Sequence, residues 1–277
     1  MKTGIYPDHD EATYHADPAL SQSGAKLLLD CPARYRYEMA NRTEKDAYDL
    51  GHAVHAKVLG VGSPVATYPT EHLTASGNVS TKQATVQWVA DQRAAGLIPI
   101  TPEQAEQVDA MAEAILAHAE ARALLERDGQ AEVSMWWHEE TALGWDTTTV
   151  PCRGRIDRLT THDGEPLAID LKSTARNTGP IAWRSAVLDH GYDLQAAAYD
   201  SGYQKLTGDP LPMTHIAVEK AAPYVVAVYP PMPWDYLARG ARRWQQAIDT
   251  YAECIATGHW PARPGLQTYP DLPAWAR

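Results

Sequence analysis

The hydrophobic residues of this chain change their spacing near residue 130, and this change restricts the fold more than any other feature. Before it they recur every three or four residues, a period typical of helices, whereas from 131 to 173 they alternate, a period typical of strands. Turn residues divide the alternating region into three strands, and the last two are joined across Asp163 and Gly164, a pair favoured in hairpins. We therefore expect a meander of strands at the centre of the fold.

Helical patterns lie on both sides of this meander. Helices are predicted at 19–40 with a break at Pro32, and at 45–59, 80–95, 101–127, 181–189, 193–206 and 234–257, with a loop over 60–80 and strands at 214–220 and 224–229. The helix at 101–127 starts with Thr101, Pro102 and Gln104, the pattern of a capping box with proline at the first helical position. The expected fold class is α/β, with a mixed central β-sheet flanked by helices and with helical N-terminal additions.

The domain organisation follows from the same pattern. A chain of 277 residues can bury one substantial core, and no linker is long enough to force a boundary. We expect a single domain over 1–277, in which 1–128 is mainly helical and 129–277 contains the sheet core and the C-terminal helix.

Charge limits the kinds of partner. A net charge of −11 argues against broad, non-specific attraction to nucleic acid, which normally uses a basic surface. It leaves room for a local basic groove, and two arginine-rich stretches are candidates for it: Arg34 with Arg36, and residues 239–243. Such stretches are more often a solvated helix face than a phosphate clamp.

Cysteine use and hydropathy indicate the compartment. The three cysteines are far apart and odd in number, which fits a reducing cytosol and argues against a disulfide framework or a four-cysteine iron–sulfur cluster. No apolar run reaches transmembrane length, and the N-terminus is too polar for a signal peptide. We expect a cytoplasmic protein with no membrane partner.

Two carboxylates and a lysine lie on the second and third predicted strands. Asp170 and Lys172 are two residues apart and therefore project from the same face of a strand, and the hairpin brings Asp157 near them. Two carboxylates can hold Mg²⁺ or Mn²⁺, and the lysine can stabilise charge on a phosphate. A surface strand that alternates acid, apolar and base residues is the other explanation, but the apolar neighbours favour a partnered or metal-bound aspartate.

Further candidates lie on other segments. His52 and His55 are three residues apart on a predicted helix and share a face, so either could reach a metal or the two could be a surface pair. Glu132, at the start of the meander, is an additional metal-ligand candidate or an ordinary exposed glutamate. Gln195 and Tyr199 share a helix face beside the site, where Gln195 could hold a phosphate or a water and Tyr199 could be core.

Four of these motifs occur in the order found in RecB-type nucleases, which have a PD-(D/E)xK core. The series is Gly51-x-x-x-His55, Gly154-Arg155-Ile156-Asp157, Asp170-Leu171-Lys172 and Gln195-x-x-x-Tyr199. Flanking segments, from YHADPALSQSGAKLLLDCPARYRYE near the start to TGHWP and PAWAR at the end, resemble the RecE-type exodeoxyribonuclease VIII family of phages and prophages. The resemblance extends from about Tyr14 to Trp275.

The resemblance implies a role for each motif residue. It implies four metal ligands, namely His55, Asp157, Asp170 and the carbonyl oxygen of Leu171. It implies five catalytic residues, namely Asp157, Asp170, Lys172, Gln195 and Tyr199. His52 stands where relatives more often have a small residue or threonine, and it remains an additional candidate with Glu132. Arg155 joins Arg34 and Arg36 as a candidate DNA contact.

The function implied by the resemblance is that of a Mg²⁺-dependent exodeoxyribonuclease with a PD-(D/E)xK, restriction-endonuclease-like core. It would degrade one strand of linear duplex DNA from an end, 5′ to 3′, and supply single-stranded DNA to a RecT-like annealing protein. Relatives form ring-like homo-oligomers, so a ring such as a tetramer in the cytoplasm of a bacterial host is expected. Two alternatives remain open: a structure-specific or end-processing nuclease of the same fold, and a non-catalytic DNA-end-binding recombination scaffold.

Overall fold

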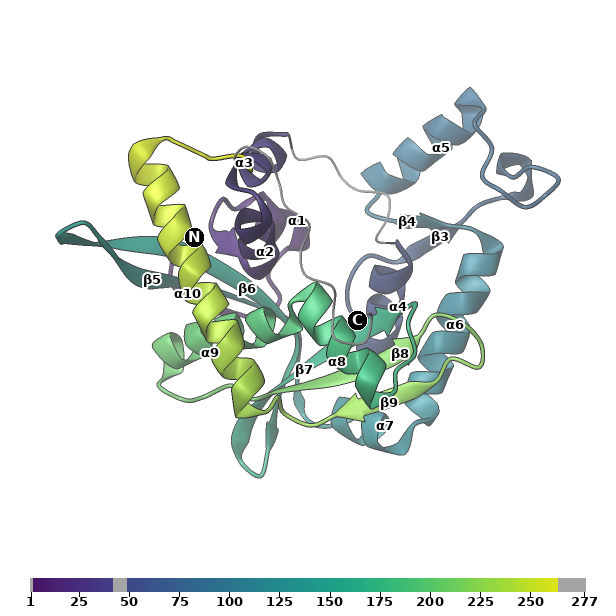
Figure 1. Ribbon diagram of the computed structural model, residues 1–277. Helices are drawn as coiled ribbons and strands as arrows, with labels where there is room; N and C mark the ends of the chain where they lie inside the picture. Colours follow the sequence, from purple (N-terminus) through teal and green to yellow (C-terminus); the bar gives the residue numbers. More distant parts are fainter. Residues whose placement is uncertain (1, 42–48, 264–277) are drawn as a thin grey trace, which may run out of the picture.

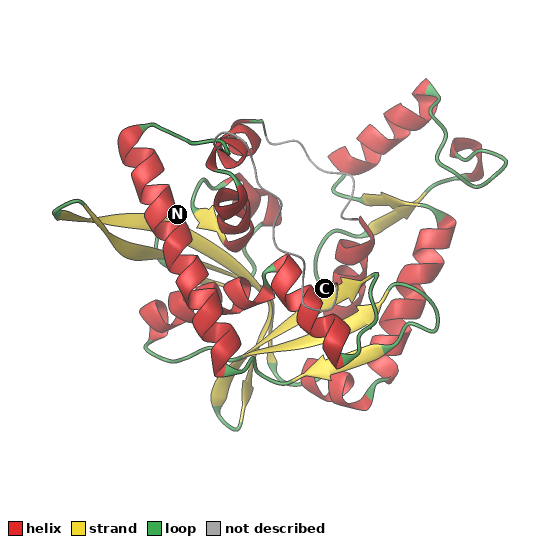
Figure 2. Ribbon diagram, viewed as in Figure 1, coloured by secondary structure: helices red, strands yellow, loops and turns green. Residues whose placement is uncertain are grey.

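A seven-stranded sheet forms the centre of the molecule, and helices cover both of its faces (Figures 1 and 2). The computed structural model describes residues 2–41 and 49–263. The strands follow the order β1 (Gly4–Tyr6), β5 (Gly129–Leu143), β6 (Asp146–His162), β7 (Glu165–Thr174), β8 (Met213–Glu219) and β9 (Val226–Tyr229), and β2 (Leu20–Ser21) pairs with β6. The β7–β8 and β2–β6 pairs are parallel and the others antiparallel, which confirms the predicted mixed α/β sheet.

The β6–β7 hairpin forms as predicted. Asp163 and Gly164 both have positive φ, 52° and 86°, as a two-residue type I′ turn requires. The pair Arg158↔Ile169 is the innermost of this ladder, so the register places Asp157 opposite Asp170. Earlier in β6, Cys152 pairs with β2, so Asp157 lies where β6 passes from β2 to β7.

Ten α-helices surround the sheet in the described parts of the chain. They are α1 (Glu11–Ala16), α2 (Gln22–Asp30), α3 (Pro32–Ala40), α4 (Asp49–Leu59), α5 (Gln83–Ala94), α6 (Pro102–Ala117), α7 (Ala119–Leu125), α8 (Pro180–His190), α9 (Tyr192–Thr207) and α10 (Trp234–Thr257). The predicted break at Pro32 and the capping box of Thr101 with Gln104 are confirmed. None of the helices in 2–41 and 49–263 has both the length and the hydrophobicity needed to span a bilayer.

Two segment predictions were wrong in detail. The single helix expected at 101–127 is divided at His118, whose backbone is extended (ψ 116°) and whose ring accepts a hydrogen bond from the Ala121 N–H, so that a new helix starts there. The loop expected at 60–80 contains β3 (Val65–Thr67) and a 3₁₀ turn, η2 (Thr70–His72), and β3 pairs with β4 (Ile98–Ile100) in a small second sheet. Residues 45–48 of the predicted third helix and the tail from 264 lie outside the described residues.

The two faces of the sheet are covered by two different hydrophobic clusters. One joins β5 and β6 to α2, α9 and α10 through Leu28, Trp137, Leu194 and other side chains. The other joins β7 and β8 to α4 and α6 through Ile169 and Leu171. Alternation along β7 then places Asp170 and Lys172 on the α9 side, while α4 approaches the same region from the opposite face.

Candidate active site

Asp157 lies at an irregularity shared by β5 and β6. The pairs Ala131↔Arg158 and Val133↔Ile156 place Glu132 opposite Asp157, and Glu132 has a left-handed backbone with φ 54°. Ile156 belongs to the cluster on the α9 side and Leu159 packs against that same cluster, so the alternation of β6 shifts by one residue between them. This local shift allows the Asp157 side chain to meet groups from both α4 and β7.

Asp170 is the centre of a buried ion-pair network. Its side chain is 2% exposed, and its Oδ1 accepts hydrogen bonds from Lys172 Nζ at 2.8 Å and Gln195 Nε2 at 2.7 Å. Burial alone would raise the pKa of Asp170, but the Lys172 ammonium outweighs it and leaves this pKa below its ordinary value. The carboxylates in turn raise the pKa of Lys172 against the effect of its burial. The pair is therefore charged at neutral pH.

The second oxygen of Asp170 lacks a hydrogen bond. Oδ2 is buried, lies 2.7 Å from Lys172 Nζ without hydrogen-bond geometry, and is 3.8 Å from His215 Nε2. Buried polar atoms in folded proteins are almost always satisfied, by protein, water or an ion. This oxygen is therefore available to a cation or a water.

His55 approaches from α4. Its Nε2 lies 2.7 Å from the Leu171 carbonyl oxygen, and because a carbonyl can only accept, Nε2 carries the proton. The unprotonated Nδ1 then faces Asp157 Oδ2 at 3.6 Å. The same Oδ2 of Asp157 also accepts a hydrogen bond, at 2.8 Å, from the backbone N–H of Leu171 on the adjacent strand β7. The helix and the hairpin are thus joined at one point.

Three side chains in this group fit a metal ion. Ligand atoms of His55, Glu132 and Asp157 lie within 4.8 Å of one another, and two carboxylates with one imidazole suit a hard or borderline divalent cation. Burial, followed by the charge of Asp157, raises the pKa of Glu132, as expected for acidic groups brought together without a cation. Asp170 lies outside this trio and faces Lys172 and Gln195 instead.

Gly154 and Tyr199 are coupled by packing. A Cβ built on Gly154 would lie 2.8 Å from Tyr199 Cε1, so only glycine leaves room for the ring. The Tyr199 hydroxyl accepts the Arg155 N–H at 3.3 Å, and burial raises the pKa of this hydroxyl well above its ordinary value. Tyr199 therefore fixes the approach of α9 to β6 just before Asp157.

The sequence of residues 21–272 matches the family described as a PDDEXK-like domain of unknown function (DUF3799). The chain belongs to this family. Together with the sheet and helix arrangement, this membership confirms the predicted PD-(D/E)xK fold class. No curated protein is significantly similar in sequence.

One solved structure shares the fold of this chain. The crystal structure of a "putative exonuclease" from Eubacterium rectale is 16% identical, with a TM-score of 0.55 and 94% of each chain covered, a similarity that shows the fold. The structure of SSO0001 is also 16% identical and covers 83% of this chain and 75% of that chain, but its TM-score of 0.36 is too low to bear on the fold.

The remaining predicted residues of the PDDEXK-like domain lie outside the centre or are already engaged. His52 is exposed on α4 and is not part of the metal-binding trio. Arg155 is largely buried and donates to Glu132, the His9 carbonyl and Ser134. The guanidinium groups of Arg34 and Arg36 are exposed on α3, where they bind Asp30 and the Gly258 carbonyl. DNA binding by these three arginines stays a prediction.

Two residues near the centre were not predicted. His215 on β8 pairs in register with Asp170, and burial lowers its pKa to about 4, so the ring is neutral. Tyr192 places its ring 5.1 Å from Lys172 Nζ, a cation–π distance. A histidine within an apolar strand was a visible signal for the first, but Tyr192 depends on how α9 starts and left no sequence signal.

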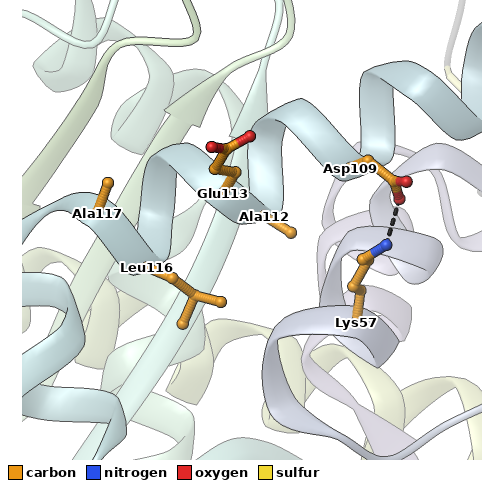
Figure 3. A pocket seen from close by; sticks show the side chains of 6 residues that line it. All are labelled: Lys57, Asp109, Ala112, Glu113, Leu116 and Ala117. Carbon is orange, nitrogen blue, oxygen red and sulfur yellow. Dashed lines mark hydrogen bonds and ion pairs between the residues drawn. The ribbon is translucent and has the colours of Figure 1, made fainter.

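A separate hollow lies between α4 and α6 (Figure 3). It is lined by Lys57, Asp109, Ala112, Glu113, Leu116 and Ala117. Lys57 and Asp109 form an ion pair across it. None of the residues in the metal-binding trio or the Asp170 network contributes to this lining, so the hollow is separate from the candidate active site.

Metal binding should strengthen as pH rises through neutrality. Burial and then the charge of Asp170 raise the pKa of Asp157 to about 7 in the metal-free protein, so below that pH a proton competes with the cation. Burial lowers the pKa of His55, which is therefore not the main titrating group. We expect Mn²⁺ affinity to rise about tenfold from pH 6 to pH 8, measured by calorimetry.

The proton count provides the control for this measurement. In two buffers of different ionisation enthalpy, binding at pH 6 should release close to one proton and binding at pH 8 almost none. The same behaviour is expected for His52→Gln, because His52 is outside the trio. An affinity independent of pH over this range would show that Asp157 is not a ligand.

Proposed function

We propose that this PDDEXK-like protein is a Mg²⁺-dependent exodeoxyribonuclease of the RecE type. It degrades one strand of linear double-stranded DNA from an end, 5′ to 3′, and leaves single-stranded DNA for recombination by annealing. A RecT-like annealing protein is the proposed partner, and a ring-like homo-oligomer in the cytoplasm of a bacterial host is the proposed working form.

One observation carries this proposal. Four sequence-distant segments place the complete motif set in one region: His55 contacts the Leu171 carbonyl, Asp157 contacts the Leu171 N–H, and Asp170 contacts Lys172 and Gln195. A surface strand that merely alternates charge would not bury Asp170 to 2% exposure or join it to a glutamine from another helix. The arrangement supports catalysis and speaks against a scaffold that has lost its chemistry.

Each residue has a role that follows from its contacts. His55, Asp157 and Glu132 would hold the cation, while Asp170 pairs with Lys172 and accepts from Gln195. A bound Mg²⁺ would polarise the scissile phosphate and lower the pKa of the attacking water. Lys172 is held as a cation by Asp170, so it stabilises negative charge on the phosphate and does not act as a base.

The surrounding residues keep these groups in position. Gln195 donates to Asp170 Oδ1 and so limits rotation of that carboxylate, whose Oδ2 stays beside the Lys172 ammonium. Tyr199 supports the backbone at Arg155, two residues before Asp157. Arg155 and Glu132 form an ion pair, and this pair limits the movement of Glu132 near the proposed cation. Such supporting contacts typically change metal affinity or activity by about 10- to 100-fold.

The family and the similar solved structure both support a nuclease function. The structurally similar protein from Eubacterium rectale carries the name of an exonuclease, and its likeness extends over nearly both chains. The RecE-type assignment rests on the motif series and its flanking segments. Because the net charge is −11, DNA must be held by a local groove and the bound cation rather than by bulk attraction.

An end-dependence assay tests the proposal. End-labelled linear duplex and covalently closed circular duplex are incubated with the protein in Mg²⁺ and in chelator. We expect digestion of the linear substrate in Mg²⁺, little digestion of the circle, and no digestion in chelator. Shortening from the 5′ end, followed on duplexes labelled at either end, tests the polarity.

The same assay separates the alternatives. Cutting of branched or flapped duplex with little activity on blunt linear ends would identify a structure-specific or end-processing nuclease. Binding of free ends in Ca²⁺ with no hydrolysis in Mg²⁺ or Mn²⁺ would identify the scaffold. Asp157→Asn serves as the negative control, because it keeps the side-chain shape and removes the ligand charge.

A further inference from the structure

Gly191 lies close both to Lys172 and to a group of cationic side chains. It has a left-handed backbone, φ 65°, and ends α8 one residue before Tyr192, whose ring lies under the Lys172 ammonium. A Cβ on Gly191 would lie 2.9 Å from Lys26 Cδ and 3.3 Å from a terminal nitrogen of Arg243. Both cationic side chains therefore pack against this one residue, next to the site.

The cations come from two helices that are distant in sequence. Lys26 lies on α2, and Arg239 and Arg243 lie one turn apart on α10. Lys26 Nζ donates to the His190 carbonyl at 2.9 Å, which fixes it beside Gly191. The side chains of Arg239 and Arg243 are 38% and 29% exposed, and Lys26 is half-buried, so a solvent-borne ligand can reach them.

The group carries an excess of positive charge. Arg239 and Arg243 share a single carboxylate, the fully buried Asp193, which holds both guanidinium groups in place. Lys26 makes no ion pair with any residue in 2–41 or 49–263, and the group that accepts its hydrogen bond, the His190 carbonyl, is uncharged. Burial, followed by the charge of Lys172, lowers the pKa of Lys26 to about 8, and the carboxylates of Asp170 and Asp193 only partly offset this effect.

The start of α9 adds to this preference for an anion. Its N-cap is Gly191, which has no side chain to accept the first N–H groups of the helix, and the acidic residue of its first turn, Asp193, is engaged by Arg239 and Arg243. Helix N-termini favour negative groups. In a chain of net charge −11, three cations are thus gathered around the residue that starts α9.

We propose that Lys26, Arg243 and Arg239 around Gly191 form a binding subsite for a phosphate group of the nucleic-acid strand, adjacent to the phosphate that is cut. This inference rests on the proposed nuclease function and deepens it. Tyr192 directly follows Gly191 and its ring contacts Lys172, so it links the subsite to the proposed catalytic lysine. The subsite holds the strand in register and supplies the local attraction that the acidic surface cannot.

Two sources of the phosphate are distinguished by experiment. An internal phosphodiester and a terminal phosphate have the same charge chemistry at this point, and both would bind Lys26. The probes are short duplexes in which single phosphates near one end are replaced by neutral methylphosphonates, and duplexes that end in phosphate or in hydroxyl. Binding is measured in Ca²⁺, so that no turnover is required.

The variants are Lys26→Met, Lys26→Arg and, as a matched control, Lys82→Met on the exposed start of α5. We expect Lys26→Met to weaken duplex binding about tenfold and to lower the salt dependence, with recovery in Lys26→Arg and no change in Lys82→Met. One phosphate position should be coupled to Lys26. Neutralising that phosphate should weaken duplex binding by the wild type but have little further effect on binding by Lys26→Met.

The outcomes decide the inference separately from the proposed function. Coupling at an internal position identifies a backbone phosphodiester, and coupling only to the terminal group identifies an end phosphate; both support the subsite. Strictly additive losses at every position would overturn it, even if the wild type digests linear duplex in Mg²⁺. Absence of any hydrolysis by the wild type, with coupling still present in Ca²⁺, would refute the nuclease and leave a phosphate-binding site.

Discussion

Asp170→Asn is expected to lower the rate of hydrolysis by roughly three orders of magnitude, because several kcal/mol of charge stabilisation are lost and each 1.36 kcal/mol is a factor of ten. The amide keeps the volume of the carboxylate, so the apolar neighbours Ile169 and Leu171 stay packed. Turnover on linear duplex in Mg²⁺ measures the effect, and the thermal unfolding midpoint checks the fold.

Asparagine is a better probe here than alanine. Asp170→Ala would remove the acceptor of both Lys172 and Gln195 and leave a buried ammonium without its partner, which costs about 3–5 kcal/mol of stability. Asp163→Asn is the matched control, because that residue is in the exposed hairpin turn and asparagine tolerates its positive φ. If Asp170→Asn folds and its turnover is close to that of the wild type, the Asp170-Leu171-Lys172 motif on β7 is not part of the active site.

Lys172→Met should reduce turnover by about 10²- to 10³-fold while leaving metal binding intact at high pH. Lysine offers no ligand to a cation, and methionine fills a similar volume beside the Tyr192 ring. The loss of the ammonium also removes the main attraction that lowers the pKa of Asp170. The pKa of the carboxylate pair then rises, so the pH at which Mn²⁺ affinity is half-maximal should move upward.

Calorimetry at several pH values separates these two effects. At pH 9 the Lys172→Met protein should bind Mn²⁺ almost as the wild type does, and at pH 6 it should bind more weakly. Lys205→Met, far along α9, is a less suitable control because Lys205 pairs with the buried Glu139, so Lys82→Met is preferred. Equal loss of Mn²⁺ affinity at all pH values would indicate that Lys172 shapes the metal site instead of acting on the substrate.

The strand part of the site could be predicted because it depends on short-range rules. The Asp163–Gly164 turn sets the register of the hairpin, and the register places Asp157 opposite Asp170. The two-residue period of a strand places Lys172 beside Asp170, as their 2.8 Å contact confirms. The four-residue spacing of Gln195 and Tyr199 likewise requires only that the helix be regular.

Glu132 shows the limit of such rules. Its sequence context was compatible with an ordinary exposed glutamate, but the left-handed backbone and the shifted alternation opposite it bring it within the metal-binding trio. No local pattern marks this irregularity, because a glutamate with positive φ is disfavoured and persists only when surrounding contacts over-determine it.

By itself, the sequence determined the order of helices and strands after residue 129, the hairpin that pairs the two aspartates, and the residue types of the candidate site, since these depend on neighbours a few positions apart. Only the tertiary structure decided which groups meet. His55 reaches the Leu171 carbonyl across 116 residues, and Lys26 reaches the turn before α9 across 164. Such contacts depend on how α2 and α4 pack on opposite faces of the sheet, and that packing is a cooperative property of the whole core.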